Sequence, residues 1–92
     1  MTEELMQKYI EALFEEKEAF YLYKHIYKME SSPNRATVLA IMEDEMHHYE
    51  KVRSLLFGSM SIKTPLEDVF KSMVEEDLGR MKSCLEQVKA MK

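Results

Sequence analysis

Residues that interrupt regular structure are scarce in this chain. Its 92 residues include only two Gly and two Pro. A β-sheet needs a turn every several residues, and turns draw heavily on these two residue types. The chain is therefore expected to be all-α and to consist of a few long helices. Its 33% charged and 46% hydrophobic residues are typical of a folded domain rather than of a disordered segment.

Capping signals divide the chain into three helices within a single domain, 1–92. Thr2 can cap the first helix, and Ser32 followed by Pro33 can open the second. Gly58 suits the left-handed residue that ends a helix, and the segment Thr64-Pro65-Leu66-Glu67 has the form of a capping box. Because only two or three residues join the first two helices, we expect a long antiparallel helical hairpin plus a third helix. The expected ranges are about 3–30, 33–57 and 65–91.

The charge balance and the hydropathy argue against several classes of function. Seventeen acidic residues against 13 basic ones give a net charge of −4, which offers no basic surface for a nucleic acid. No run of about 18 apolar residues occurs, so no membrane span is expected. The acidic N-terminus lacks the basic flank and apolar block of a secretory signal. Cys84 is the single cysteine and cannot form an internal disulfide, which favours a cytoplasmic location.

Each expected helix carries an apolar stripe when its residues are projected at 100° per residue. Three helices of this length have more apolar face than one compact bundle needs, so we expect self-association to at least a dimer. The stripes comprise Leu5, Tyr9, Ala12, Leu13, Phe20, Tyr23 and Tyr27 in the first helix, Val38, Ile41, Met42, Tyr49, Val52 and Leu56 in the second, and Leu66, Phe70, Met73, Val74, Leu78, Met81, Leu85, Val88 and Met91 in the third.

Two carboxylates and an imidazole interrupt the stripes of the first two helices. Glu16 falls in the middle of the first stripe, and Glu45 falls inside the second, with His48 one turn on at its edge. Burying a carboxylate without a partner costs several kcal/mol, so these groups must reach solvent, pair with each other or bind a cation. Glu16 lies about 15 residues before the turn and Glu45 about 13 after it, so they should meet in the hairpin. Carboxylate and imidazole ligands suit iron or manganese and tolerate zinc.

Other interpretations of the charged residues stay open. Asp44 and His47 offer an alternative register of the same spacing, although both would point outward. Asp77 interrupts the third stripe, and we interpret it as an acid that faces a basic residue across an oligomer contact, with a further metal ligand as the alternative. The inward glutamates could also be locally paired acids without a metal role.

Two segments resemble the ferritin-like di-iron proteins. The segment Glu16-Lys17-Glu18-Ala19-Phe20-Tyr21-Leu22-Tyr23 resembles the first-helix pattern of that family, in which a ligand Glu precedes a small residue by three positions and an aromatic residue by seven. The segment Asp44-Glu45-Met46-His47-His48-Tyr49-Glu50-Lys51-Val52 is similar to the family's acidic Glu-x-x-His segment. Complete members carry two such halves, and this chain supplies one. The resemblance is closest to half-length members such as the encapsulated ferritins, with the rubrerythrin-like branch second.

The resemblance implies a ferritin-like four-helix bundle that is completed by homodimerisation around two iron ions per dimer. In this arrangement Glu16 would bridge the two ions, and Glu45 and His48 would complete the ligands of each. Tyr23 would be a hydrogen-bond partner near the metal. Glu15 and Glu18 would form outer cation sites.

The function that this resemblance implies is iron handling, with a ferroxidase-like oxidation of Fe²⁺ if the site is active. After Leu85 we recognise no apolar tail of the kind that directs encapsulated ferritins into a protein shell. The alternative function is a non-enzymatic helical oligomerisation module, in which the inward charges are paired locally. Iron uptake by the purified protein distinguishes the two.

Overall fold

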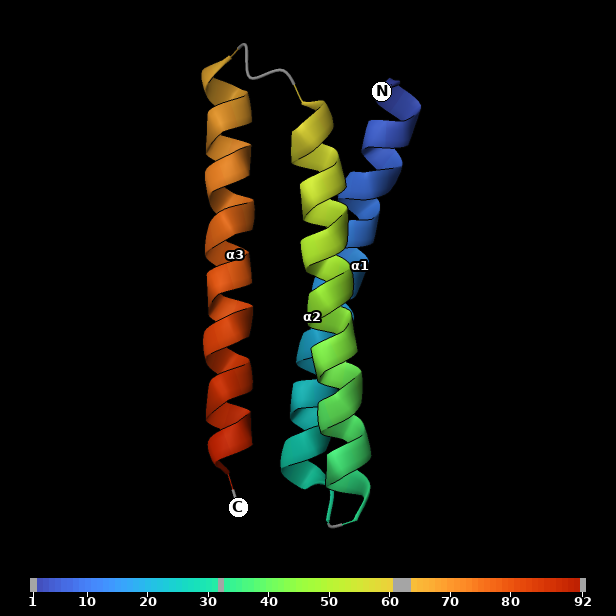
Figure 1. The fold of residues 1–92 in the computed structure, drawn as a ribbon, viewed down its shortest axis with the longest axis vertical. Helices are drawn as coiled ribbons and strands as arrows, with labels where there is room; N and C mark the ends of the chain where they lie inside the picture. Colours follow the sequence, from blue (N-terminus) through green and yellow to red (C-terminus); the bar gives the residue numbers. More distant parts are fainter. Residues whose placement is uncertain (1, 32, 61–63, 92) are drawn as a thin grey trace.

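The structure is a computed structural model that describes residues 2–31, 33–60 and 64–91. It contains three helices, α1 (Glu3–Met29), α2 (Asn34–Ser59) and α3 (Pro65–Ala90), and no strand among the described residues. Figure 1 shows α1 and α2 as an antiparallel hairpin, with α3 running along it in the direction of α1. The all-α prediction and the three-helix order are therefore confirmed. The molecule is elongated, with principal extents of 48 × 21 × 16 Å.

Two of the predicted helix starts are confirmed by their capping bonds. The hydroxyl of Thr2 accepts a hydrogen bond from the backbone N–H of Leu5 at 3.2 Å. The hydroxyl of Thr64 accepts one from the N–H of Glu67 at 3.3 Å, and Pro65 follows as the first helical residue. Both bonds satisfy donors that a helix otherwise leaves without a partner at its first turn.

The predicted boundaries of α2 need correction at both ends. Gly58 does not end the helix, because its backbone stays out of the left-handed region and the helix continues to Ser59. The N–H of Met60 closes this end by donating to the carbonyls of Leu56 and Phe57. Pro33 is the N-cap residue rather than the first helical one, and it makes no side-chain capping bond. The predicted cap Ser32 lies outside the described residues.

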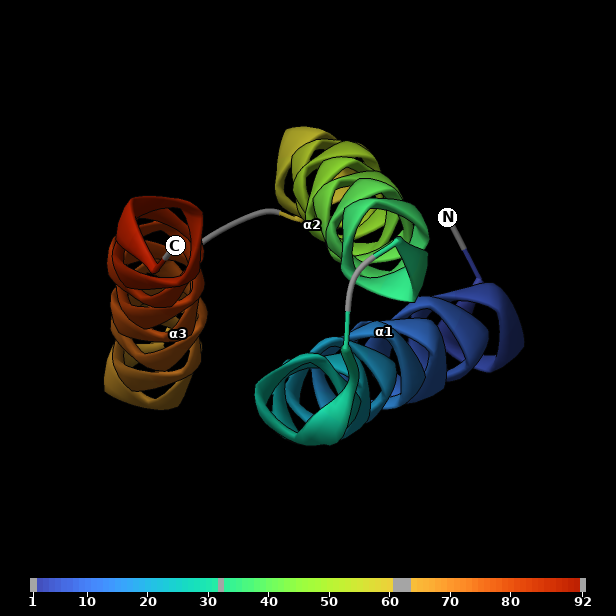
Figure 2. The same cartoon turned by 90° about the horizontal axis from the view of Figure 1, so that it is seen from below.

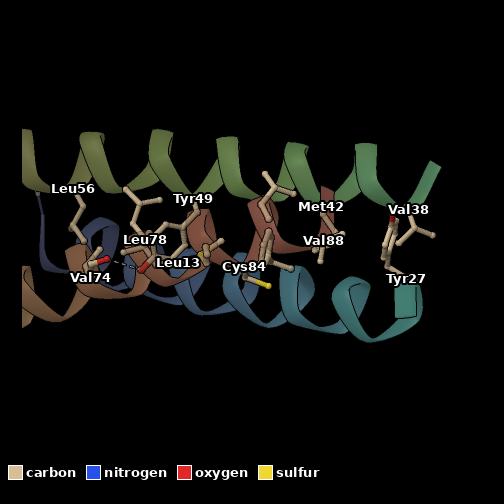
Figure 3. Packing of buried hydrophobic residues seen from close by; sticks show 13 residues of the cluster. Leu13, Tyr27, Val38, Met42, Tyr49, Leu56, Val74, Leu78, Cys84 and Val88 are labelled. Atoms are coloured by element: carbon tan, nitrogen blue, oxygen red, sulfur yellow. Dashed lines mark hydrogen bonds between the residues drawn. The ribbon is translucent and has the colours of Figure 1, made fainter. Parts of the chain in front are cut away.

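A continuous apolar core runs between the three helices. Six of its largest side chains are less than 2% exposed, and burying each contributes roughly 1.5–3 kcal/mol relative to leaving it in water. Figure 3 shows side chains of α1, α2 and α3 meeting along this core, including Cys84, which is buried as a free thiol. The six side chains are Tyr49, Phe20, Met42, Leu56, Met81 and Val88.

Helix α3 is attached mainly to α2. Lys82 pairs with Glu50 at 2.9 Å and Lys89 with Glu43 at 3.3 Å, and a third ion pair joins Arg53 to Glu75. The Lys82 ammonium also holds the pKa of the Glu50 carboxyl below its usual range. Viewed end-on in Figure 2, the three helices stand at the corners of a triangle. These three ion pairs therefore lie on the α2–α3 side of the triangle.

The open edge between α1 and α3 leaves apolar side chains in water. Leu66 is 77% exposed and Met73 is 56% exposed, although both belong to the predicted apolar stripe of α3. Leu5 and Met91, which were also assigned to stripes, are exposed as well. A stripe gives the direction of a face but not whether another element covers it, and the sequence analysis expected apolar face beyond what one compact bundle needs.

Over the residues that the structure describes, none of the three helices has a stretch with the length and hydropathy that a bilayer crossing requires.

Candidate metal centre

The hairpin brings Glu16, Glu45 and His48 together near the middle of its length. Glu16 is on α1, and Glu45 and His48 lie one turn apart on α2. One ligand atom from each residue lies within 4.8 Å of the other two. Nδ1 of His48 on α2 lies 3.5 Å from Oε2 of Glu16 on α1. The predicted convergence of these three residues is thus present in the folded chain.

The spacing on α2 explains why Glu45 and His48 act together. Residues three apart on a helix lie on one face, so the carboxylate and the imidazole point in nearly the same direction. In the antiparallel hairpin, Glu16 of α1 lies at the same depth. The arrangement therefore follows from helix periodicity and from the short α1–α2 connection, without any irregular backbone at the site.

The group faces away from α3. Glu50 reaches α3 through its ion pair with Lys82, and residues two apart on a helix point about 200° apart. His48, two residues before Glu50, is therefore turned to the opposite side of α2. Its side chain is 59% exposed, whereas that of Glu16 is only 24% exposed. The group is open to solvent on the imidazole side and closed at the Glu16 carboxylate.

The two carboxyl groups share a proton near neutral pH. The pKa of Glu45 is raised to about 7, first by a hydrogen bond with the Glu16 carboxylate, then by burial and by the negative charge of Glu16. The positive charge that His48 can carry opposes this rise in pKa. A protonated Glu45 carboxyl can donate to Glu16, whereas two ionised carboxylates this close would repel each other.

One oxygen of the site has no N–H donor bound to it. Among the described residues, Oε2 of Glu16 is buried and accepts no hydrogen bond from a lysine, an arginine or a backbone N–H, and Nδ1 of His48, 3.5 Å away, makes no hydrogen bond with it. An unsatisfied buried oxygen costs about 1–3 kcal/mol, and more when it is charged. A cation bound between the three ligand atoms would remove this cost. The donor set and the orphaned oxygen therefore fit a metal ion.

The other residues named from the sequence lie elsewhere. Tyr23 is half-buried against the apolar core, and no hydrogen bond links it to the three ligands within the described part of the chain. Glu15 and Glu18 are exposed on α1. Asp44 and His47, the alternative register, are also exposed, as expected from their outward direction. Glu16, Glu45 and His48 are thus the predicted ligands that the fold brings together.

The ion-pair partner of Asp77 differs from the predicted one. Its carboxylate pairs with Lys17 of the same chain at 2.9 Å, whereas the sequence pattern was interpreted as a contact across an oligomer. Sequence reasoning missed Lys17 as its partner. The available signal was the lysine at the border of the α1 stripe, but 60 residues separate it from Asp77.

Comparison with known proteins adds no assignment. No family model matches this chain, and no curated protein and no solved structure matches it significantly.

Replacing Glu45 by glutamine is expected to stabilise the metal-free protein at pH 8. The raised pKa means that protonated Glu45 stabilises the fold fully below about pH 4.5, and that this stabilisation is lost as the pH rises through about 7. Glutamine stays neutral and can still donate to Glu16. Because the site is partly open to water, we expect a gain on the order of 1 kcal/mol at pH 8 and little change at pH 4.5.

Urea denaturation of chelator-treated protein at the two pH values measures this effect. Glu18→Gln is the matched control, because it removes an exposed carboxylate from the same region without touching the pair. An equal effect of Glu45→Gln at both pH values would show that the two carboxyl groups do not share a proton.

Proposed function

We propose that this chain binds a transition-metal ion through Glu16, Glu45 and His48, and that two chains together form a di-iron centre that oxidises Fe²⁺. The observation that supports metal binding most directly is the buried Oε2 of Glu16, which has no N–H donor as a hydrogen-bond partner among the described residues and lies beside the other two ligands. A lone structural acid would be satisfied by a lysine, an arginine or a backbone N–H instead.

The donor set narrows the choice of metal. Two carboxylates and one imidazole suit iron and manganese, tolerate zinc, and do not favour the soft ions that prefer thiolates. Glu16, Glu45 and His48 would together hold one such ion. Iron is the ion in this group that supports the oxidation expected from the ferritin-like resemblance.

The position of the group supports completion by a second chain. His48 is turned away from α3, and Ile41 and Leu55 lie two turns before and after it on the same face of α2. Leu55 is 46% exposed and Ile41 is half-buried, so this face offers apolar contact around the ligands. In the proposed homodimer the two hairpins pack through this face, and each chain contributes one Glu and one Glu-x-x-His.

The residues of the chain have distinct tasks in this proposal. Glu16 supplies the buried carboxylate and Glu45 supplies a second one, which must give up its shared proton when a cation enters. His48 supplies a neutral nitrogen from the solvent side. Iron, when bound, would supply one-electron chemistry, with oxygen or peroxide as the oxidant. Metal uptake should therefore release protons and weaken below neutral pH.

The test is anaerobic addition of Fe²⁺ to the metal-free protein, followed by admission of air. We expect a ferric absorbance band and oxygen consumption faster than in buffer alone. Glu16→Ala and His48→Ala should lose both signals. Oxidation at the same rate in these two variants would show that another site, or free iron, is responsible.

The exposed apolar edge between α1 and α3 favours the second candidate function, a helical oligomerisation module. Phe14 and Met73 are each more than half exposed there. A protein that self-associates and takes up no Fe²⁺ in the same experiment would fit this function instead.

A further inference from the structure

The residues that directly follow two of the ligands contact the same turn of α3. Lys17 follows Glu16, and its ammonium lies 2.9 Å from the Asp77 carboxylate. Tyr49 follows His48, and its hydroxyl donates to the carbonyl of Val74 at 3.5 Å, as Figure 3 shows. Val74 and Asp77 are three residues apart on α3. One turn of α3 therefore contacts both helices of the candidate metal centre, next to the ligands Glu16 and His48.

The side chains that make both contacts are largely buried, so losing either contact would cost free energy. Lys17 and Asp77 are only 27% and 24% exposed, so either charge without the other would be poorly hydrated. Tyr49 is buried, and a buried hydroxyl that loses its hydrogen-bond partner costs free energy. These contacts resist rotation of α1 and α2 about their own axes.

Metal ligands tolerate little rotation of the helix that carries them. A carboxylate about 5 Å from a helix axis moves by about 1 Å when the helix turns by about 10°. Metal–ligand distances, by contrast, are held within about 0.2 Å. Among the described residues, the Lys17–Asp77 pair is the only ion pair between α1 and α3. The orientation of α1 is thus tied to α3 at the residue next to Glu16.

We propose that Asp77 is a positioning residue for the metal centre: through Lys17 it fixes the rotation of α1 that turns Glu16 toward Glu45 and His48. This inference rests on the proposed metal binding. Asp77 contacts no ligand directly, and it acts through the adjacent residue on α1. In this proposal α3 makes the positions of the three ligands of one chain more rigid than the α1–α2 hairpin alone would.

Co²⁺ is a suitable probe, because its visible absorption reports both affinity and ligand geometry. Asp77→Asn is expected to lower Co²⁺ affinity about tenfold and to change the shape of the absorption band, with the number of bound ions per chain unchanged. The charge-swapped double variant Lys17→Asp/Asp77→Lys should restore most of the affinity and the band. Rescue by the swap distinguishes positioning from a general loss of stability.

The matched control is Glu76→Gln, which removes the neighbouring carboxylate of α3 that pairs with Arg80 at the surface. It should bind Co²⁺ like the wild type. If circular dichroism shows that Asp77→Asn is unfolded, Lys17→Met removes the same pair from the α1 side and is expected to lower the affinity equally.

The outcomes separate the two proposals. Wild-type affinity in both Asp77→Asn and Lys17→Met would overturn the positioning role and leave the metal centre intact. Failure of the wild-type protein itself to bind Co²⁺, Fe²⁺ or Mn²⁺ would overturn the proposed function, and the positioning role with it.

Discussion

Replacing Glu16 by alanine is expected to reduce metal affinity by more than about a hundredfold. Substituting a residue that only supports a ligand already costs about 10–100-fold, and Glu16 supplies a ligand atom directly. Within the group that the described residues form, its carboxylate is the ligand that α1 supplies, so the variant would leave Glu45 and His48 alone on α2. Equilibrium dialysis against Fe²⁺ under anaerobic conditions measures the loss as bound iron per chain.

Glu15→Ala is the control for this experiment. It makes the same change of charge and side chain one position earlier on α1, where the glutamate is exposed and points away from the group. It should bind iron like the wild type. His48→Ala should behave like Glu16→Ala, and unchanged iron stoichiometry in both would contradict a metal centre at these residues.

Replacing Phe20 by alanine is expected to bring the protein close to unfolding. The ring of Phe20 is fully buried and packs edge-on against Tyr21 with the ring centres 5.3 Å apart. Truncating a buried phenylalanine costs about 3–5 kcal/mol, because the lost contacts and the remaining cavity add. A domain of this size has a free energy of unfolding of roughly 5–10 kcal/mol, so about half of it or more would be lost.

Phe14→Ala is the matched control for the core. Phe14 is 52% exposed at the open edge between α1 and α3, and its truncation should cost less than about 1 kcal/mol. Urea denaturation followed by circular dichroism gives both values in the absence of metal. Equal losses for the two variants would mean that the core is not centred on the inner face of α1.

Local rules predicted the parts of the fold that depend on neighbouring residues. Thr2 and Thr64 cap their helices because a hydroxyl at that position reaches a free N–H of the first turn. Glu16 and Glu45 meet because a short connection makes the hairpin antiparallel, and their distances along it are then nearly equal. Both results need only helix geometry and the position of the turn.

The sequence pattern did not predict features that depend on residues far apart in the chain. The exposure of Leu66 and Met73 depends on where α3 lies relative to α1, and a periodic stripe does not contain that information. The pairing of Asp77 with Lys17 joins residues 60 positions apart, so an interchain partner was equally compatible with the sequence. Gly58 stays helical because glycine permits the left-handed conformation without requiring it.

The central claim is that Glu16, Glu45 and His48 hold one metal ion per chain. Anomalous diffraction at the iron absorption edge, from crystals grown anaerobically with Fe²⁺, tests it most directly. We predict an anomalous peak among Oε2 of Glu16, the Glu45 carboxylate and the His48 imidazole, close to its two-fold mate in a second chain. A crystal with iron bound elsewhere, or with Glu16 and Glu45 still paired and no peak between them, would contradict the claim.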